Sequence, residues 1–414
     1  MADALAHRTV LIVQPSGIRN RARVLKVAKT LLESGRTVVF FTKLPVGSGF
    51  TDVRVDRVLD CPVLQFPDAH DFLAPARTRI PAVNWLLMVQ YLHATMWHYA
   101  RAIRPDVIHT FGAAAIGIGD DFRRRLRSEG CAASWVHDYL EYTRGHAFID
   151  DRRQGGKEDT AWHETVVKYE TEHAGREDHA FTVSPQLATA LARDYGLAHE
   201  PTVLLNAPRL GDFEAGSQRT IRKKLRLGPD VPLIVYSGGV TPLRGVDALT
   251  CAIGRMPDVH LALITNSQTE YTESLVGAAR TGGWAQRLHL VGYVEPDAVP
   301  TFLQDATAGV HPLSHYGNAE VALPNKLFDY LHARLPVVVS DVGAMAGFVT
   351  GHQLGEVFPA GNVDALVDAL RRVIAAREPI VSRIARDDHL LAENAWESQE
   401  AALVEVYDRL SGAG

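Results

Sequence analysis

The chain has 414 residues, of which 46% are hydrophobic and 22% are charged. These proportions are those of an ordinary globular protein and exclude disordered and fibrous classes, and the length suits two large domains better than one core. The formal charge of −5 gives no general attraction for polyanions, so no nucleic-acid partner is expected.

The cysteine spacing and the lack of long apolar segments favour a cytoplasmic protein. Cys61, Cys131 and Cys251 are far apart and lack the C-x-x-C spacing of a metal or redox site, so no disulfide framework is expected. Residues 1–10 lack the apolar core of a signal peptide, and no run approaches the roughly 18 apolar residues of a spanning helix. We therefore expect a cytoplasmic protein without a transmembrane segment.

Short apolar runs alternate with helical patterns in the first half of the chain. Strands are expected at 9–13, 37–42, 105–109, 134–136, 180–184 and 202–205, with helices at 24–32 and 85–103. A glycine loop ending at Gly17 separates the first strand from the first helix. Such alternation forms parallel βαβ units, so residues 1–207 are predicted to be one doubly wound domain.

The same alternation restarts after Pro208. Strands are expected at 233–236, 261–264, 288–291, 308–311 and 337–340, with helices at 219–227, 298–305, 327–333, 362–375 and 392–410. Residues 208–385 are therefore predicted to be a second doubly wound α/β domain. Two Rossmann-like domains in tandem would face each other across a cleft, because open α/β sheets bind ligands beyond the carboxyl ends of their strands.

The most informative segment runs from Gly317 to Asp341. Pro324 suits the first turn of a helix, which would leave the N–H groups of Asn325 to Leu327 free at the helix N-terminus. Such an end attracts phosphate, and Lys326 adds a positive charge that opposes the helix dipole unless an anion is bound. Asp329 follows one turn later on the same face, where its carboxylate could accept two ribose hydroxyl hydrogens.

This segment resembles the donor-binding region of family 4 retaining glycosyltransferases. It is closest to a subgroup with Pro-x-Lys-Leu-Phe-Glu-Tyr, which is written here from Pro324 to Tyr330. Asp329 falls at the family's ribose-binding glutamate, whereas Val321 stands in register with its first glutamate. The neighbouring Glu320 is therefore taken as the acid that positions the donor sugar.

The resemblance implies a GT-B fold and a reaction. A hexosyl group would move from a nucleoside diphosphate sugar to an acceptor hydroxyl with retention of configuration. The family also ends in a helix that crosses back to the first domain, and residues 386–414 resemble it. We expect no cofactor besides the donor substrate.

A second stretch of resemblance is the loop from Ser237 to Asp247. There Gly238 and Gly239 would let the backbone approach phosphate, and Arg244 takes the place of the family's diphosphate-binding lysine. The family's second basic residue falls on Gly239, which leaves Arg244 and Lys326 to stabilise the departing diphosphate. Three further donor-site residues are predicted, two from the family's nucleobase loop and one by position alone: Tyr293, Val294 and Asn266.

The first domain is expected to bind the acceptor. Residues 137–145 resemble the subgroup's Tyr-Asp-x-His-Glu-Tyr stretch, with Leu140 at the family's histidine and His137 as the nearest substitute. His137 and Asp138 are predicted to orient the acceptor. Further acceptor-side residues are predicted as follows: Gly17, Arg19, Glu141 and Arg144. A solvated helix start would explain Arg19 equally well.

No metal site is predicted. The acidic pairs Asp120-Asp121 and Asp150-Asp151 lack Asp-x-Asp spacing, and residues 162–179 contain no H-E-x-x-H, so their histidines and glutamates are assigned to solvated helix. The basic run 219–226 would permit peripheral contact with anionic lipid, although family members place an arginine-rich helix there.

Two alternatives stay open. A non-catalytic or auxiliary glycosyltransferase homologue, which binds sugar nucleotide or a partner enzyme, would explain why Val321, Gly239 and Leu140 stand where the family has polar residues. A nicotinamide dehydrogenase needs G-x-G-x-x-G after the first strand, and residues 14–19 do not supply it. Each donor motif alone would fit an ordinary packed helix or solvated ion pair, so the interpretation depends on their joint order.

Overall fold

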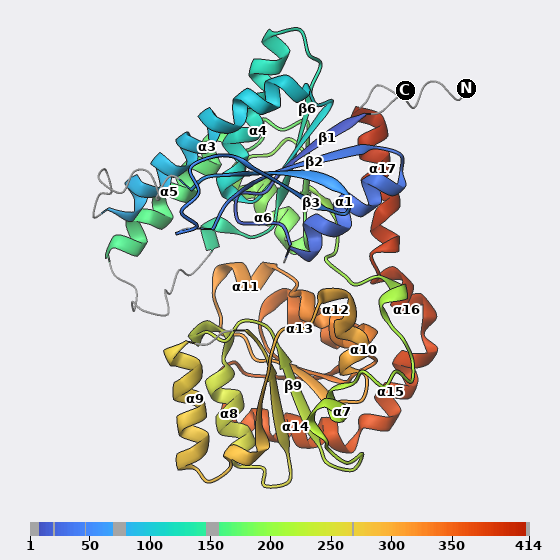
Figure 1. Cartoon of the computed structure of the whole chain (residues 1–414). Coiled ribbons are helices and arrows are strands. Elements are labelled where there is room, and N and C mark those ends of the chain that lie inside the picture. The colour runs from blue at the N-terminus through green and yellow to red at the C-terminus, as the bar shows by residue number, and fades with distance from the viewer. Residues whose placement is uncertain are drawn as a thin grey trace. The chain divides into compact units, whose positions relative to one another are not determined.

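The computed structural model describes residues 8–19, 21–45, 47–68, 80–145, 157–266 and 269–410, and Asp150 and Asp151 lie outside them. The chain forms two compact units (Figure 1): Met1–Arg144 with Gly155–Leu204 and Gln399–Gly414, and Gly145–Gln154 with Leu205–Ser398. The units meet in sequence after Leu204 and after Ser398, whereas the predicted boundaries follow residues 207 and 385. Each unit is an α/β domain with a mainly parallel sheet.

The sheet of the first unit has eight strands in the order β3-β4-β2-β1-β5-β6-β7-β8. Their bounds are β1 Thr9–Val13, β2 Thr37–Lys43, β3 Arg54–Val58, β4 Cys61–Phe66, β5 Val107–Phe111, β6 Ser134–Tyr139, β7 His179–Thr182 and β8 Thr202–Val203. Only the β3–β4 pair is antiparallel. The strand order reverses direction between β1 and β5, and the loops after these strands mark the switch point of this sheet.

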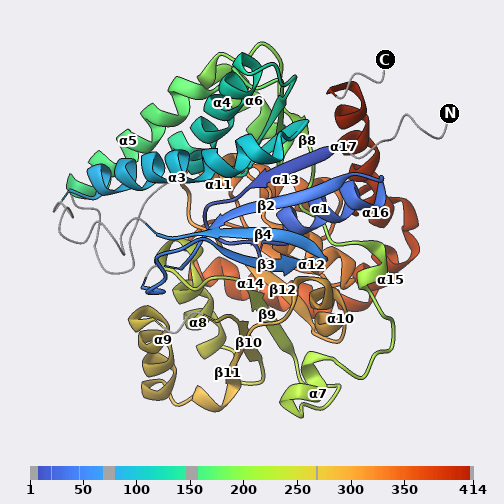
Figure 2. The ribbon, with the colours of Figure 1, turned by 45° about the horizontal axis from the view of Figure 1, so that its top comes forward.

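Helices cover both faces of this sheet. They are α1 Ala22–Glu33, α3 Pro81–Ile103, α4 Ala113–Ser128, α5 Lys157–His173, α6 Pro185–Tyr195 and α17 Glu397–Leu410, with the short turn η2 Thr143–Gly145. The helices α3, α4 and α5 pack against one another, and α1 lies beside α17 (Figure 2). Because both faces are covered, β5 and β6 are buried along their whole length.

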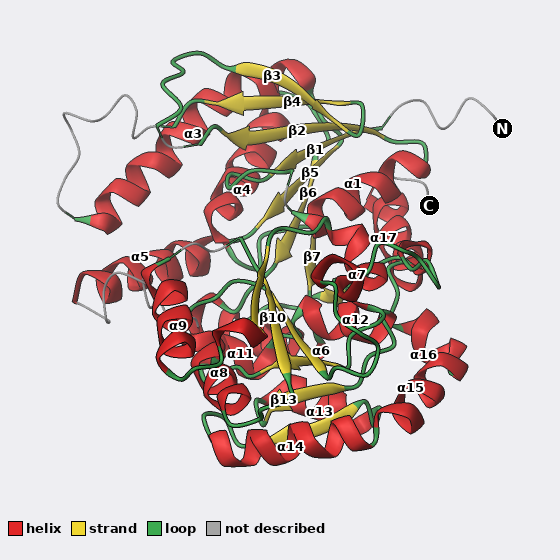
Figure 3. Ribbon diagram, turned by 60° about the horizontal axis from the view of Figure 1, so that its bottom comes forward, coloured by secondary structure: helices red, strands yellow, loops and turns green. Residues whose placement is uncertain are grey.

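The sheet of the second unit has six parallel strands in the order β11-β10-β9-β12-β13-β14. Its strands β10 and β13 are labelled in Figure 3. Their bounds are β9 Leu233–Ser237, β10 His260–Ile264, β11 Leu288–Val291, β12 Ala308–His311, β13 Val337–Ser340 and β14 Gly355–Phe358. The order reverses between β9 and β12, which predicts a ligand site at the carboxyl ends of these two strands.

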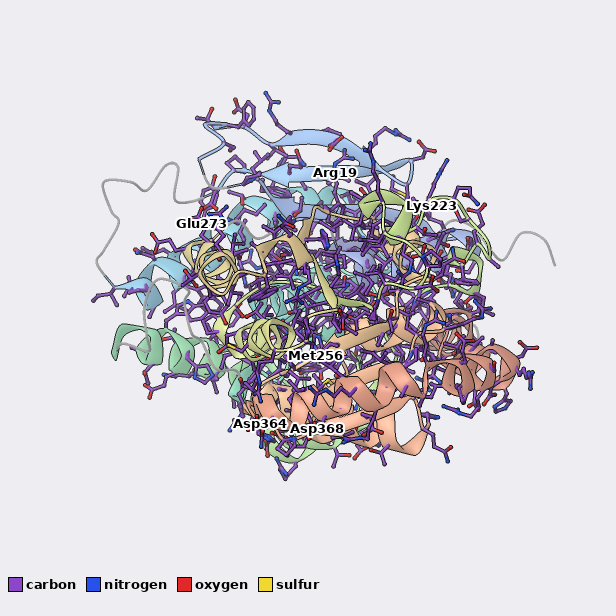
Figure 4. The ribbon with its side chains drawn as sticks, turned by 90° about the horizontal axis from the view of Figure 1, so that it is seen from below. Arg19, Lys223, Met256, Glu273, Asp364 and Asp368 are labelled. Carbon is purple, nitrogen blue, oxygen red and sulfur yellow. The ribbon has the colours of Figure 1, made fainter. Side chains whose placement is uncertain are left out.

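The helical elements of this unit are η3 Leu210–Asp212, α7 Ile221–Leu225, η4 Pro242–Arg244, α8 Val246–Gly254, α9 Glu270–Thr281, η5 Ala285–Arg287, η6 Pro296–Ala298, α10 Val299–Leu303, α11 Gly317–Val321, α12 Asn325–His332, α13 Gly343–Gly351, α14 Val363–Ala375, α15 Arg377–Arg386 and α16 Asp388–Glu393. One face of the sheet packs on α8, α9 and α14, and the other on α10, α12 and α13. The acidic side chains of Glu273 on α9 and of Asp364 and Asp368 on α14 are exposed (Figure 4).

Two features of the secondary structure differ from the prediction. The single helix expected at 392–410 is divided into α16 and α17, because Trp396 is fully buried between them and its N–H donates to the Pro208 carbonyl at 2.9 Å. The strands β3, β4 and β14 were not predicted. The sequence of β3, RVDRV, is short and carries three charges.

A close contact ties α12 to the centre of its sheet. Tyr330 of α12 is fully buried, accepts the Ser237 N–H at 3.0 Å and donates to the Val310 carbonyl at 3.3 Å. Gly309 makes room for the ring, because a Cβ there would lie 2.5 Å from it. This contact fixes the helix that carries Lys326 and Asp329 against β9 and β12.

Gly309→Ala is therefore expected to lower the stability of the second unit by about 1–3 kcal/mol, the usual cost of overpacking a core. Gly347→Ala is the matched control, because Gly347 lies in α13 with nothing within 4 Å of its added Cβ and alanine favours a helix. Urea unfolding of both variants, followed by circular dichroism, measures the two effects. Equal stabilities would contradict this account of the Tyr330 contact.

Candidate functional site

The carboxyl edge of the second sheet collects the polar residues that follow its strands. The loops after five successive strands contribute Gly238 after β9, Asn266 after β10, Tyr293 after β11, His315 after β12 and Asp341 after β13. Parallel strands bring all these loops to one edge of the sheet, beside the switch point between β9 and β12. Asn266 and Tyr293 are exposed there, and Val294 is half-buried.

The glycine loop holds Arg244 at this edge. Gly245 adopts φ of 63°, and an added Cβ would lie 1.9 Å from the Pro312 carbonyl oxygen, so η4 packs closely on the loop after β12. The Ser314 N–H donates to the Leu243 carbonyl at 3.0 Å and fixes the same contact. Glycine is thus required at position 245 by both conformation and space.

Arg244 is half-buried and carries an unbalanced charge. Among the described residues, no carboxylate forms an ion pair with its guanidinium. Its charge acts on two buried neighbours, Tyr236 and His311. A partly desolvated cation without a counter-charge is suited to bind an anion.

The N-terminus of α12 provides a second positive group. The helix begins at Asn325, with Pro324 extended before it at φ −67° and ψ 135°. The Leu327 N–H donates to the Pro324 carbonyl at 3.1 Å, so the expectation of a free N–H at Leu327 is wrong. Within the described chain, the N–H groups of Asn325 and Lys326 have no partner and stay available to an anion.

Lys326 and Asp329 form the expected pair on one face of α12. The Lys326 Nζ lies 3.0 Å from Asp329 Oδ2, and their side chains are 27% and 11% exposed. Partial burial limits solvent screening, so the pair holds both side chains in place. Asp329 keeps its second carboxylate oxygen for another hydrogen bond.

Glu320 lies at the centre of a hydrogen-bonded bridge. Its Oε1 lies 2.6 Å from His315 Nδ1, and its Oε2 accepts the Gly343 N–H at the start of α13 at 3.0 Å. His315 Nε2 lies 3.0 Å from Asp341 Oδ1, which also accepts the Ala360 N–H at 2.8 Å. The Glu320 carboxylate is thus fixed in orientation while its side chain stays 39% exposed.

The bridge favours a positive charge on His315. Its hydrogen bond to Glu320, and the charges of Glu320 and Asp341, raise the pKa of His315 above its ordinary value. Sequence analysis did not select His315 or Asp341 as site residues. Their positions directly after neighbouring strands β12 and β13 were the available signal.

His137 and Asp138 lie in β6 with no solvent-exposed surface, on opposite faces of the first sheet. Asp138 forms a buried ion pair with Arg23 of α1 at 2.7 Å. His137 Nδ1 lies 2.8 Å from Thr110 Oγ1, and burial lowers the pKa of His137 to about 3. Both side chains are therefore interior groups of this structure and do not reach solvent.

The other predicted acceptor-side residues are spread over the first unit. The Gly17 N–H donates to Thr42 Oγ1 at 3.1 Å, and Arg19 pairs with Asp56 of β3 at 2.6 Å. Arg144 donates to Thr171 at 3.1 Å and packs over the ring of Tyr195. Glu141, directly after β6, is exposed.

The assignment of residues 162–179 to solvated helix is wrong for Glu170, which is buried, and for Glu177, Asp178 and His179, which lie beyond the end of α5 at His173. The Glu170 carboxyl is 1% exposed and accepts a hydrogen bond from the Tyr195 hydroxyl. Burial raises the pKa of Glu170 to about 7, although hydrogen bonds from Tyr195 and Thr143 act to lower it. The side chain sits under η2, where its charged form is disfavoured by desolvation.

No cluster of three or more His, Cys, Asp or Glu side chains suited to a metal ion occurs in the described ranges. Among the same residues, none of the helices has both the length and the apolar character needed to cross a bilayer. In the basic run at α7, the Arg222 guanidinium donates hydrogen bonds to the Gly228 and Val231 carbonyls, each at 2.8 Å.

A family model and a curated relative each match part of the chain. Residues 231–376 match the family model described as Glycosyl transferases group 1. Over 177 residues the chain is 22% identical to phosphatidyl-myo-inositol mannosyltransferase of Mycolicibacterium smegmatis, a match that spans 42% of this chain and 44% of that protein. The match thus covers less than half of the length of this relative.

Solved structures establish the fold of the whole chain. Sucrose-phosphate synthase from Thermosynechococcus elongatus has a TM-score of 0.77 at 18% identity, covering 99% of this chain and all, 100%, of that one. Anabaena HepE in complex with UDP-glucose has a TM-score of 0.68 at 14% identity, covering 97% and 100%. The predicted GT-B fold is confirmed.

The His315 bridge makes a pH-dependent contribution to stability. A folded pKa above the unfolded value means that the contribution is complete below the unfolded pKa, about 6.5, and is lost as pH rises through the folded pKa. Glu320→Gln should lower the His315 pKa, because Glu320 is the larger cause, and Asp341→Asn should lower it less. An NMR titration of the imidazole measures this, and an unchanged pKa in Glu320→Gln would refute the bridge.

Glu170 makes a pH-dependent contribution of the same sign. Its raised pKa means that the folded state holds a proton more tightly, so stability decreases as pH rises from about 4.5 to about 7. Glu170→Gln should therefore raise the melting temperature at pH 8 more than at pH 5. Glu172→Gln, on the exposed side of the same helix, is the control and should show no such change. A parallel response of both variants would exclude a buried ionisable Glu170.

Proposed function

We propose that this chain is a retaining glycosyltransferase that moves a hexosyl group from a nucleoside diphosphate sugar to an acceptor hydroxyl, without a metal cofactor. The observation that supports this most directly is the positive edge of the second sheet, where Arg244, Lys326 and two unpartnered helix N–H groups lie within the matched domain. Retention of configuration is proposed from the resemblance of residues 317–341 to family 4.

The donor diphosphate is proposed to bind at this edge. Negative charge builds on the leaving diphosphate as the glycosidic bond breaks, and preorganised cations and N–H groups stabilise it. Arg244 and Lys326 supply the charge, with the backbone of Gly238, Gly239, Asn325 and Lys326 close to phosphate. Since these groups can do the work of a divalent ion, we propose that no metal is needed.

The remaining donor contacts follow from position. Asp329 would accept the ribose hydroxyls through the oxygen that Lys326 leaves available. Tyr293, which is 44% exposed, and Val294 would contact the nucleobase, with Asn266 after the neighbouring strand. Pro324 and Leu327 shape the start of α12, and their mutual hydrogen bond holds its first turn open toward the ligand.

Glu320 is proposed to position the donor sugar. Its carboxylate is held by His315 and the Gly343 N–H, so it can accept sugar hydroxyls in one fixed orientation. The bridge to Asp341 prevents the side chain from rotating away. This role is consistent with its partial exposure.

The acceptor side is proposed to lie in the first unit. Since His137 and Asp138 are buried, we propose that they act indirectly, by holding β6 and the loop that presents Glu141 and Arg144. Gly17 and Arg19 follow β1 at the switch point of the same sheet. The mannosyltransferase relative is named for phosphatidyl-myo-inositol, which makes polyol and lipid headgroups the first acceptors to test.

Arg244→Ala and Lys326→Ala are each expected to weaken nucleoside diphosphate binding about 10- to 100-fold, the effect of losing one charge-assisted hydrogen bond. Isothermal titration with UDP, GDP and ADP measures this, beginning with UDP because HepE binds UDP-glucose. Lys223→Ala is the control, since Lys223 is an exposed cation on α7 (Figure 4). Equal affinities in all three variants would exclude this diphosphate site.

Turnover separates the enzyme from the auxiliary homologue. The nucleoside diphosphate that binds most tightly is tested as its glucose and mannose conjugates, with and without inositol as acceptor. The assay detects the nucleoside diphosphate released on transfer or hydrolysis. Release with the wild-type protein and its loss in Glu320→Gln supports catalysis. Tight binding without release from any donor would favour the non-catalytic homologue.

A further inference from the structure

His311 ends β12 directly below the positive edge of the second sheet. It pairs in register with Val339 of β13, and two residues earlier Gly309 pairs with Val235 of β9. Its ring stacks on that of Tyr236 with centroids 5.8 Å apart and an interplanar angle of 8°. The imidazole of β12 therefore lies beside a side chain of β9, the other strand that defines the switch point.

Both ring nitrogens of His311 lack a hydrogen-bond partner, although the side chain is only 2% exposed. The other buried histidines of the described chain each have one paired nitrogen: His109 with Tyr407, His137 with Thr110 and His332 with the Asn394 carbonyl. A neutral imidazole always carries one N–H, and a buried unpaired donor is unfavourable. His311 is thus the exception that requires a physical reason.

The charges around His311 point to an anion as the missing partner. Burial, followed by the positive charges of Arg244 and Lys326, lowers the pKa of His311 to about 3, and Arg244 has no ion-pair partner among the described residues. The ring is therefore neutral and keeps one N–H to donate. An acceptor that approaches both cations would carry negative charge and could satisfy this donor as well.

We propose that His311 is a binding residue of the donor site, whose ring N–H donates to a phosphoryl oxygen of the nucleoside diphosphate beside Arg244 and Lys326. This inference rests on the proposed function and extends it. The unpaired donor is preorganised for the diphosphate, because the free protein offers it no competing acceptor. The unpaired donor lowers the stability of the free protein, and its hydrogen bond to the ligand would increase the affinity.

Two substitutions test the proposal by affinity. His311→Leu removes both nitrogens and retains most of the volume, whereas His311→Gln retains an N–H donor. His311→Leu should weaken UDP binding about tenfold or more and leave the weaker binding of uridine unchanged, because uridine has no phosphate. His311→Gln should recover most of the UDP affinity. His260→Leu is the control for loss of a histidine, because His260 lies at the amino end of β10, away from the carboxyl edge of the sheet.

Stability of the free protein gives a second, independent readout. His311→Leu should raise the melting temperature, since it eliminates an unpaired buried donor. His332→Leu should lower it, since it breaks the 2.7 Å bond to the Asn394 carbonyl. If His311→Leu does not fold, His311→Gln is compared with His311→Met, which has a similar shape without an N–H.

The outcomes separate this proposal from the proposed function. If His311→Leu binds UDP as tightly as the wild type while Arg244→Ala does not, His311 makes no phosphate contact and the diphosphate site remains. If His311→Leu weakens uridine and UDP equally, the residue is structural and the proposal is wrong. If the wild type binds none of UDP, GDP and ADP, the proposed function and this inference are both overturned.

Discussion

Two positive charges at one edge of the second sheet, of which only Lys326 has an ion-pair partner among the described residues, are the constraint on which the site depends. Lys326 has Asp329 as its partner, whereas Arg244 forms no ion pair with any described residue. Like charges held near each other in a half-buried place repel, and an anion relieves that repulsion. The fold keeps both cations in place through Gly245 against Pro312 and Tyr330 against Gly309. The two cations are thus held in fixed positions, and the positive charge of Arg244 is not neutralised by a carboxylate of the described chain.

In the first unit, a buried arginine is neutralised by a carboxylate of the protein itself. Arg23 and Asp138 are buried, and their charges balance each other at 2.7 Å. Removing either partner would leave an unpaired charge in a medium of low dielectric, so the pair fixes α1 against β6. Asp138 satisfies an interior arginine here, in contrast with Glu320, which stays half-exposed with an orientation set by His315 and a backbone N–H. Asp138 is thus held as a structural acid, whereas the partial exposure of Glu320 leaves its carboxylate accessible to a ligand.

The sequence predicted what depends on local pattern. The apolar strands at the centre of each sheet and the start of α12 could be located, because hydrophobic runs and the Pro-x-Lys signal act over a few residues. The bridge from His315 to Asp341 joins residues 26 apart, and the pair of Arg23 and Asp138 joins residues 115 apart. Such contacts depend on which strands are neighbours, and strand order is not written in local periodicity.

Burial of polar residues is the other property that local pattern does not disclose. Glu170 was assigned to solvated helix because residues 162–179 lack metal-ligand spacing, yet its side chain is buried and accepts a hydrogen bond from Tyr195 of α6. His311 looked like part of an apolar strand, and only the arrangement of β9, β12 and η4 places it beside two cations. In both cases the side chain's chemistry is set by groups distant in sequence. The two differ in one respect that bears on function: Glu170 has a partner within its own unit, whereas both nitrogens of His311 lack one. A buried group already satisfied by its surroundings contributes to stability, whereas a buried donor kept unsatisfied next to uncompensated charge is prepared for a ligand.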